Sequence, residues 1–324
     1  MAVTTLHRVR TTRAGLLLAP APALALALAL AALTGCDTAR PAASGAEPTA
    51  RGGKLSVVAT TTQIRSMAEA VAGGLAGVRS IIPPGADAHE FEPKPSDVQA
   101  ISQSALVLKN GIGLDDWVDK IIENAGGQRP LITVSEGAHL RKGDAEDPQG
   151  DPHIWFDVTN AMTMTRNIRD ALAQVDPAHA DAYKANAETY LGKLSELDKY
   201  IFAQVGTIPP DQRKMVTNHD AFGYFIDRYG LTFVGSIIPS MTTEAQPSAG
   251  DMAELVQKIK ETHTKAIFVE NSINPKLAEQ LAHDAGVKVV DTLYGDSLGV
   301  PGSPAATYEG MMRYDTDTIV KALK

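Results

Sequence analysis

Residues 178–205 decide the fold, and they read AHADAYKANAETYLGKLSELDKYIFAQV. Apolar residues recur there at alternating spacings of four and three, which is the pattern of one helix face; they are Tyr183, Ala187, Tyr190, Leu194, Leu197 and Ile201. The pattern starts after Asp176-Pro177 and stops at Gly206 and Pro209. At about 1.5 Å per residue the helix would span roughly 42 Å, more than one small lobe. We therefore expect a stiff rod that joins two lobes; the alternative is a long helix packed on one lobe.

Short apolar runs alternate with helical patterns on both sides of this helix. Before it, we expect strands at 55–60, 78–82, 106–109 and 131–134, with helices at 63–72, 97–104 and 114–125. After it, we expect strands at 214–217, 231–238, 265–269 and 287–293, with helices at 221–229, 248–262, 275–285 and 307–323. Near-continuous apolar strands separated by helices indicate parallel sheets that are covered on both faces.

The predicted fold is therefore α/β, with two lobes that each hold a mostly parallel four-stranded sheet flanked by helices. We place the N-terminal lobe at 54–175, the linking helix at 176–205 and the C-terminal lobe at 206–324.

The N-terminus has the features of an export signal. Three arginines precede an uncharged Ala/Leu/Pro run at 14–33; they are Arg8, Arg10 and Arg13. A run of this length could also cross a membrane as a helix. However, Pro20 and Pro22 weaken such a helix, and small residues before a lone Cys fit processing better. We predict that residues 1–35 are a signal peptide.

The segment after the signal indicates an anchor and a tether. The string Leu33-Thr34-Gly35-Cys36 resembles a bacterial lipobox, which implies that Cys36 becomes the lipidated first residue of the mature protein. Residues 36–53 are rich in Pro, Ala, Ser, Thr and Gly and lack apolar periodicity, so we predict a flexible tether.

Composition excludes several classes of protein. With 44% hydrophobic residues, 21% charged residues and one Cys, the chain is neither disordered, nor a disulfide scaffold, nor a cysteine-rich zinc module. Residues 1–35 hold three Arg and no acid, so the rest carries 27 basic and 38 acidic residues, a net charge of −11. This charge argues against a nucleic-acid partner.

Three of the eight histidines fall at predicted strand ends. His89 follows the strand at 78–82, His153 lies beyond the one at 131–134, and His219 directly follows 214–217. Asp296 follows the last strand. Ligands of parallel α/β sheets bind outside the carboxyl ends of strands, where side chains of both lobes can meet. Three imidazoles and one carboxylate form a tetrahedral set for a metal such as Zn²⁺. The alternative is that each side chain is satisfied in its own turn.

Four local strings carry a resemblance to a known family: PPGADAHEFEPKPSD at 83–97, DPHIWFDVTNA at 151–161, TNHDAFGYFIDRYGL at 217–231 and DTLYGDSLG at 291–299. In this order they resemble the metal-binding lipoproteins of ABC importers, the ZnuA/TroA-like family of zinc and manganese receptors. The resemblance runs from about Leu55 to the C-terminus. It implies two α/β lobes joined by a rigid helix, with a metal ion between them bound by four residues, His89, His153, His219 and Asp296.

The resemblance implies capture of a metal ion rather than catalysis. We expect a monomeric solute-binding lipoprotein, anchored to the outer face of a bacterial cell membrane, that passes its ion to an ABC permease and its ATPase. A role in cell adhesion could coexist with this one. Four protein ligands leave no open position for an activated water. The competing hypothesis is a secreted zinc metallohydrolase with Asp296 or Glu270 as base, although no His-Glu-x-x-His pair is present.

Imidazole ligands favour Zn(II), which outranks Mn(II) in intrinsic affinity, so we expect zinc, with manganese as the alternative. The resemblance supports zinc, because the family's manganese receptors often have a carboxylate where His219 stands. The loop at 136–151 has only His139, which we expect to be a loop residue rather than a ligand.

A ligating histidine usually donates its second ring N–H to a carboxylate or a carbonyl. Candidate partners are Asp157, Asp220 and Glu270, each of which could instead be a surface or helix-capping acid.

Overall fold

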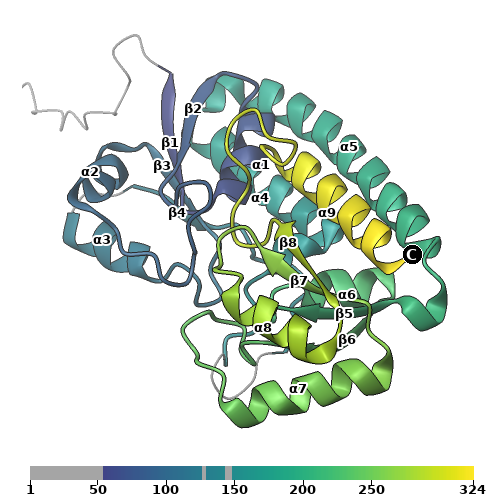
Figure 1. The fold of residues 1–324 in the computed structure, drawn as a ribbon. Coiled ribbons are helices and arrows are strands. Elements are labelled where there is room, and N and C mark those ends of the chain that lie inside the picture. The colour runs from purple at the N-terminus through teal and green to yellow at the C-terminus, as the bar shows by residue number, and fades with distance from the viewer. Residues whose placement is uncertain (1–53, 126–128, 143–147) are drawn as a thin grey trace, which may run out of the picture. The chain divides into compact units, whose positions relative to one another are not determined.

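The computed structural model describes residues 54–125, 129–142 and 148–324. The predicted signal peptide, the tether and Cys36 lie outside the described residues. The body contains two four-stranded sheets, and every strand pairing in them is parallel (Figure 1). The predicted α/β fold with two lobes is confirmed.

The N-terminal sheet has the strand order β2-β1-β3-β4. Its strands are β1 (Leu55–Ala59), β2 (Ala76–Ser80), β3 (Leu106–Lys109) and β4 (Leu131–Thr133). The lobe's helices are α1 (Thr62–Ala72), α2 (Pro95–Gln103), α3 (Trp117–Ala125) and α4 (Val158–Val175). Val57 of β1 packs into the cluster that contains α1 and α4, whereas Val58 packs with Ile101 of α2 and Val118 of α3. Alternate residues of the central strand thus face two helical layers.

The C-terminal sheet has the order β6-β5-β7-β8. Its strands are β5 (Lys214–Thr217), β6 (Thr232–Ser236), β7 (Ala266–Glu270) and β8 (Lys288–Leu293). Its helices are α6 (Gly223–Tyr229), α7 (Ala249–Thr262), α8 (Lys276–Ala285) and α9 (Tyr308–Leu323). Ile267 of β7 packs with Leu255 of α7 and Leu281 of α8, whereas Phe268 faces the main cluster. All five residues of β7 are buried.

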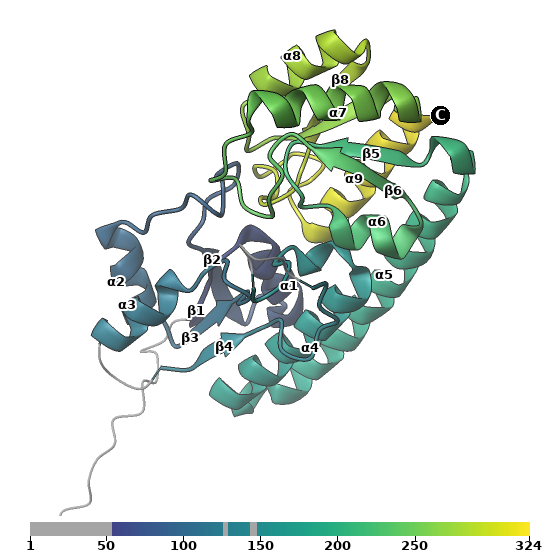
Figure 2. The same cartoon turned by 90° about the horizontal axis from the view of Figure 1, so that it is seen from below.

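Helix α5 (Ala180–Gly206) joins the two lobes, as predicted. All six residues of its predicted apolar face are buried. It packs against α1 and α4 of the N-terminal lobe and against α6 and α9, and Figures 1 and 2 show it running beside both lobes. The alternative of a helix packed on one lobe is wrong.

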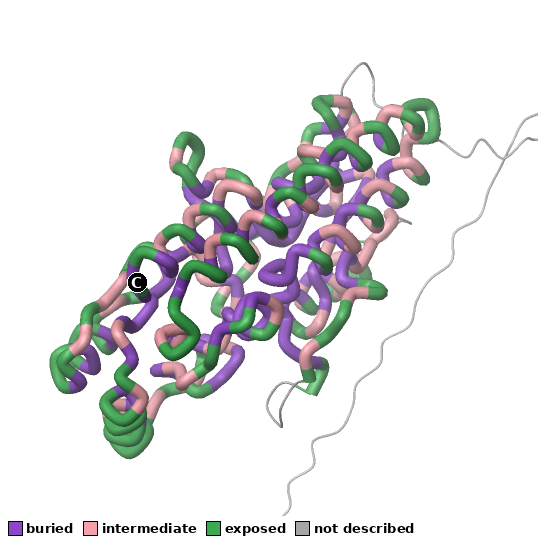
Figure 3. Tube along the Cα trace, turned by 90° about the vertical axis from the view of Figure 1, so that its right-hand side faces the viewer, coloured by how far each residue is buried: buried purple, intermediate pink, exposed green. Residues whose placement is uncertain are grey.

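The lobes also share one hydrophobic core. A single cluster of buried side chains includes Met67 of α1, Leu194 of α5, Phe225 of α6 and Met311 of α9. Figure 3 shows buried segments continuing through the middle of the molecule. At the start of α9, the Tyr308 amide donates to the Ser66 hydroxyl of α1 at 3.0 Å. Such a shared core favours small relative movements of the lobes.

Helix α4 was not predicted, and several element ends differ from the prediction. The β2 strand begins two residues earlier than expected, at Ala76, and α3 begins at Trp117 rather than 114. Strand β6 is shorter than the predicted 231–238. Across the described ranges, we find no helix with both the length and the apolar character needed to cross a membrane.

Candidate metal centre

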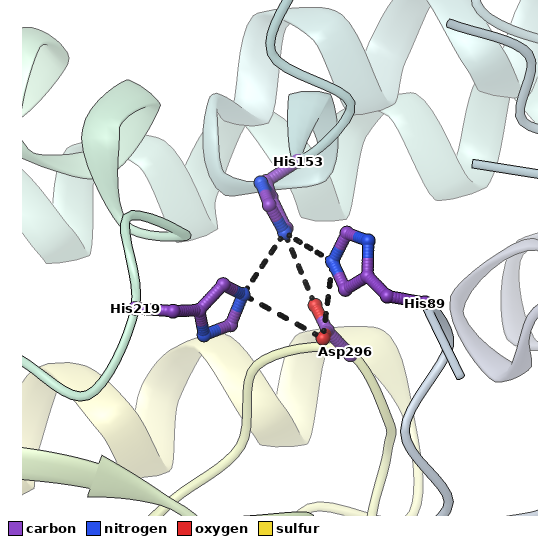
Figure 4. Close-up of side chains that lie close together, drawn as sticks. All are labelled: His89, His153, His219 and Asp296. Atoms are coloured by element: carbon purple, nitrogen blue, oxygen red, sulfur yellow. Dashed lines mark hydrogen bonds and ion pairs between the residues drawn. The ribbon is translucent and has the colours of Figure 1, made fainter. Parts of the chain in front are cut away.

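The structure brings the four predicted ligands together between the lobes. His89 lies in the loop after β2, His153 just before a short 3-10 turn (Ile154–Phe156), His219 after β5 and Asp296 after β8. Figure 4 shows the four side chains pointing from four separate segments toward a common centre. One ligand atom from each residue lies within 4.8 Å of the others.

The distances within this cluster match those of a small coordination sphere. Nε2 of His153 lies 3.2 Å from Nε2 of His89 and 3.3 Å from Nε2 of His219. The nearest oxygen of Asp296 lies 3.3 Å from His153, 3.5 Å from His89 and 3.7 Å from His219. Donors placed 2.0–2.1 Å from a tetrahedral ion are roughly 3.3 Å apart. The side chains can therefore surround an ion with little rearrangement.

The site is buried and contains a carboxylate without hydrogen-bond partners. The side chains of His153, His219 and Asp296 are 0% exposed, and that of His89 is 5% exposed. Neither carboxylate oxygen of Asp296 has a hydrogen-bond partner in the described part of the chain. Because a buried carboxylate without hydrogen bonds is costly, a cation at the centre would offset this cost.

Two buried carboxylates orient two of the histidines. Asp151 Oδ1 lies 2.8 Å from Nδ1 of His153, and Glu270 Oε1 lies 2.9 Å from Nδ1 of His219. Each contact leaves Nε2 to face the centre, as in carboxylate–histidine–metal arrangements. Glu270 therefore lies beside a candidate ligand, as the sequence suggested.

The other two suggested partners lie elsewhere. Asp157 accepts the backbone N–H of Thr159 at the start of α4, and it also contacts Arg228 at 3.3 Å. Asp220 lines a cavity of about 420 Å³ on the C-terminal lobe, together with Phe233 and Met241. Asp157 is therefore a helix-capping acid, the alternative considered above.

Sequence reasoning missed Asp151. Its Oδ1 also accepts the backbone N–H of His153, at 3.0 Å, so the Asp-Pro-His turn itself places acid and ligand together. The signal that could have revealed it is an acid two residues before a ligand with proline between them.

Burial and charge act in opposite directions on the histidines. Burial lowers the pKa of His89 to about 3. Burial also opposes the charged form of His153, but the carboxylates of Asp151 and Asp296 outweigh it and raise its pKa to about 10. Burial would raise the pKa of Asp296, yet the neighbouring imidazoles of His89 and His219 hold it below its usual range. At neutral pH the ion must therefore displace a proton from His153.

A cavity of about 190 Å³ leads to the site and is lined by both lobes. It contains His89, Pro152, Thr242 and Glu244, together with a segment around Ile112. Ile112 has a φ of 57°, a conformation that β-branched residues rarely adopt. Of the four candidate ligands, only His89 lines this cavity.

The remaining histidines of the described chain lie away from the centre. His139 is exposed in a loop, and its backbone N–H donates to Asn160 at 2.8 Å. His179 and His283 pair with neighbouring acids at exposed positions, and His263 ends α7.

Two parallel α/β lobes, one linking helix and a buried three-histidine, one-aspartate cluster define a two-lobed, metal-binding receptor. The chain belongs to the family described as "Zinc-uptake complex component A periplasmic" (ZnuA), which matches residues 57–322. The predicted family is thereby confirmed, and at family level its members are solute-binding proteins rather than enzymes.

Individual relatives differ in the metal that their names state. The chain is 36% identical to the "Manganese-binding lipoprotein MntA" of Halalkalibacterium halodurans over 286 residues, which cover 87% of this chain and 94% of the relative. It is 32% identical to the "Iron ABC transporter substrate-binding lipoprotein MtsA" of Streptococcus pyogenes over 283 residues, 85% of this chain and 91% of the relative. The solved structure of the periplasmic zinc binding protein TroA from Treponema pallidum has a TM-score of 0.79 and 31% identity, covering 84% of this chain and 99% of that one.

Proposed function

We propose that the protein captures a divalent transition-metal ion outside the cytoplasm and delivers it to an ABC permease and its ATPase. The main evidence is that three imidazole nitrogens converge on a buried carboxylate without hydrogen-bond partners. Names of relatives as ABC-transporter lipoproteins support the permease partner and a membrane anchor, which in this chain would be Cys36.

We propose Zn(II) as the ion bound most tightly. The donors are three imidazoles and one carboxylate, a set that suits zinc, and their separations fit a tetrahedron. Zinc also exceeds manganese in intrinsic affinity at such donors. The ligands would be His89, His153, His219 and Asp296.

Mn(II) is the second candidate, and one feature of Asp296 favours it. Its Oδ1 lies 3.3 Å from His153, while its Oδ2 lies 3.5 Å from His89 and 3.7 Å from His219. Both oxygens therefore face the ring nitrogens, so the carboxylate could supply two donors and bring the protein's total to five. Manganese favours more ligands and more oxygen than a tetrahedral zinc site offers. The similarity to a manganese-binding relative points the same way.

The geometry supports capture over hydrolysis. Donors from both lobes enclose the centre, whereas a hydrolytic zinc keeps an open position for water. Glu270, the base that a hydrolase would need, is buried and lies against His219. Among the residues that the structure describes, the site therefore has no free base beside an open position.

The proposal is tested with the full body of the protein, residues 37–324, purified without chelator. Elemental analysis should find about one zinc per chain, and titration of the metal-free protein should give tighter binding for Zn²⁺ than for Mn²⁺. A His219→Ala variant should lose this binding, while the control His283→Ala, at an exposed histidine, should retain it. Binding unaffected by His219→Ala would remove that residue from the site, and absence of any bound ion would overturn the function.

A further inference from the structure

Arg141 connects the two lobes next to the candidate metal centre. Its Nη1 donates to Asp151 Oδ2 at 2.5 Å, and its Nε donates to Asp227 Oδ2 at 2.8 Å. Asp151 lies two residues before His153 in the N-terminal lobe, whereas Asp227 belongs to α6 of the C-terminal lobe. One guanidinium thus bridges two acids that are 76 positions apart in sequence.

Tyr224 of α6 contacts the same segment in three ways. Its hydroxyl donates to the carbonyl oxygen of Asp151 at 2.8 Å and accepts the backbone N–H of Arg141 at 3.0 Å. The guanidinium carbon of Arg141 also lies 5.7 Å from the centre of the Tyr224 ring, within cation–π range. Helix α6 therefore holds both the backbone and the side chain of Arg141.

Gly223, the first residue of α6, leaves the space that the guanidinium occupies. A Cβ atom at this position would lie 1.6 Å from Nη1 and 2.1 Å from Cζ of Arg141. Atoms that are not bonded to each other cannot approach so closely, so any side chain at Gly223 would displace the guanidinium. The missing side chain is a specific requirement of this contact.

The bridge continues to a candidate ligand. Asp151 uses Oδ2 for Arg141 and Oδ1 for Nδ1 of His153, at 2.8 Å. Asp151 is fully buried, and Arg141 compensates its charge. The orientation of the His153 ring therefore depends, through Asp151, on a residue that is itself held by the opposite lobe.

We propose that Arg141 is a positioning residue that couples the docking of α6 to the geometry of His153 and so slows release of the metal ion. While α6 is docked, Arg141 fixes Asp151 and the ring of His153. A small displacement of α6 from the N-terminal lobe would take Asp227 and Tyr224 away from Arg141, and His153 would lose its restraint. This inference rests on the proposed metal-capture function.

The test measures association and dissociation rate constants for Zn²⁺ by stopped flow. Arg141→Met should weaken binding by about tenfold to a hundredfold, as is usual when the partner of a ligating histidine is disturbed. Most of the loss should come from faster dissociation. Asp227→Asn should act in the same direction with a smaller effect, because it removes only the charge that faces Arg141 on α6 and leaves the contacts with Asp151 and Tyr224. The control Arg169→Met should change nothing, since Arg169 pairs with Asp170 on an exposed face.

Gly223→Ala tests the position of the Arg141 guanidinium separately from its charge, because the variant keeps Arg141 but displaces its guanidinium. We expect it to accelerate dissociation nearly as much as Arg141→Met, and Asp227→Asn should add nothing further in the double variant, because the two changes remove the same contact. Wild-type dissociation rates in folded Arg141→Met and Gly223→Ala would overturn the inference, as would a loss confined to the melting temperature of the metal-free protein. If the unaltered protein bound no ion, the proposed function itself would fail instead.

Discussion

His89 and His153 belong to the same lobe but are held in different ways. The ring of His153 is fully buried and lies against Asp151, whereas His89 lines the cavity that leads to the site. The ring of His89, within the described part of the chain, has its polar and ring contacts with the other candidate ligands. We call His153, His219 and Asp296 the buried frame. Because His153 and His219 each lie beside a buried carboxylate outside the cluster, we expect the frame to hold the ion more firmly than His89 does.

Removing a member of the buried frame should have the largest effect. His153→Ala takes away a ligand and also leaves Asp151 buried with only Arg141 as a charged partner. We expect affinity for Zn²⁺ to fall by more than about a hundredfold, beyond the usual loss for an outer partner. Isothermal titration calorimetry measures this, and circular dichroism should show an unchanged fold. Retained affinity would exclude His153 as a ligand.

His89→Ala should cost less than His153→Ala, which is the direct test of the comparison. The three donors of the frame stay in place, and water from the 190 Å³ cavity can take the vacant position. We expect a loss of about tenfold to a hundredfold with faster metal exchange, measured by competition with a chelating dye. A larger loss than for His153→Ala would show that His89 is part of the frame.

Glu270→Gln should have a smaller effect again, because the side chain keeps its shape but loses its charge. Glu270 lies 2.9 Å from Nδ1 of His219, and its negative charge favours a basic, correctly oriented ring. We expect affinity to fall about tenfold. Glu261→Gln, at an exposed position on α7, is the matched control and should bind as the unaltered protein does. Equal affinities in both variants would assign Glu270 a purely structural role.

The fold was largely predictable because its main signals are periodic. The apolar face of α5 repeats over six positions, and the central strands β1, β3, β5 and β7 are mostly buried. Helix α4 escaped prediction because polar residues occupy part of its buried face. Asn160 donates to the carbonyl of His139 at 2.9 Å, and Thr165 donates to the carbonyl of Ala161 at 2.7 Å. These hydrogen bonds satisfy the polar groups but remove the hydrophobic pattern.

The candidate site was predictable in its innermost residues and in one outer partner, Glu270. His219 and Asp296 follow strands directly, so the topology of a parallel sheet places them at one edge. Arg141 and Asp227 are 86 positions apart, and their contact depends on how the lobes pack. No local pattern encodes such a pair. Candidate ligands and acids next to them in sequence or at strand ends can thus be inferred from the sequence, whereas contacts between the lobes require the tertiary structure.

The pH dependence of binding should also separate His89 from His153. The pKa of His153 is raised to about 10 in the metal-free protein, so an ion that binds at neutral pH must displace its proton. Affinity should therefore rise with pH, by at most about tenfold per pH unit for each proton released. The pKa of His89 is lowered to about 3, so this ring is already neutral between pH 5 and 8 and adds no slope. Titrations across this range should show a slope that persists in His89→Ala and becomes shallower in His153→Ala. It should not vanish there, because burial lowers the pKa of His219 but Glu270 and Asp296 outweigh burial and raise it, so His219 still releases a proton. A pH-independent affinity of the unaltered protein would contradict coordination by protonatable histidines.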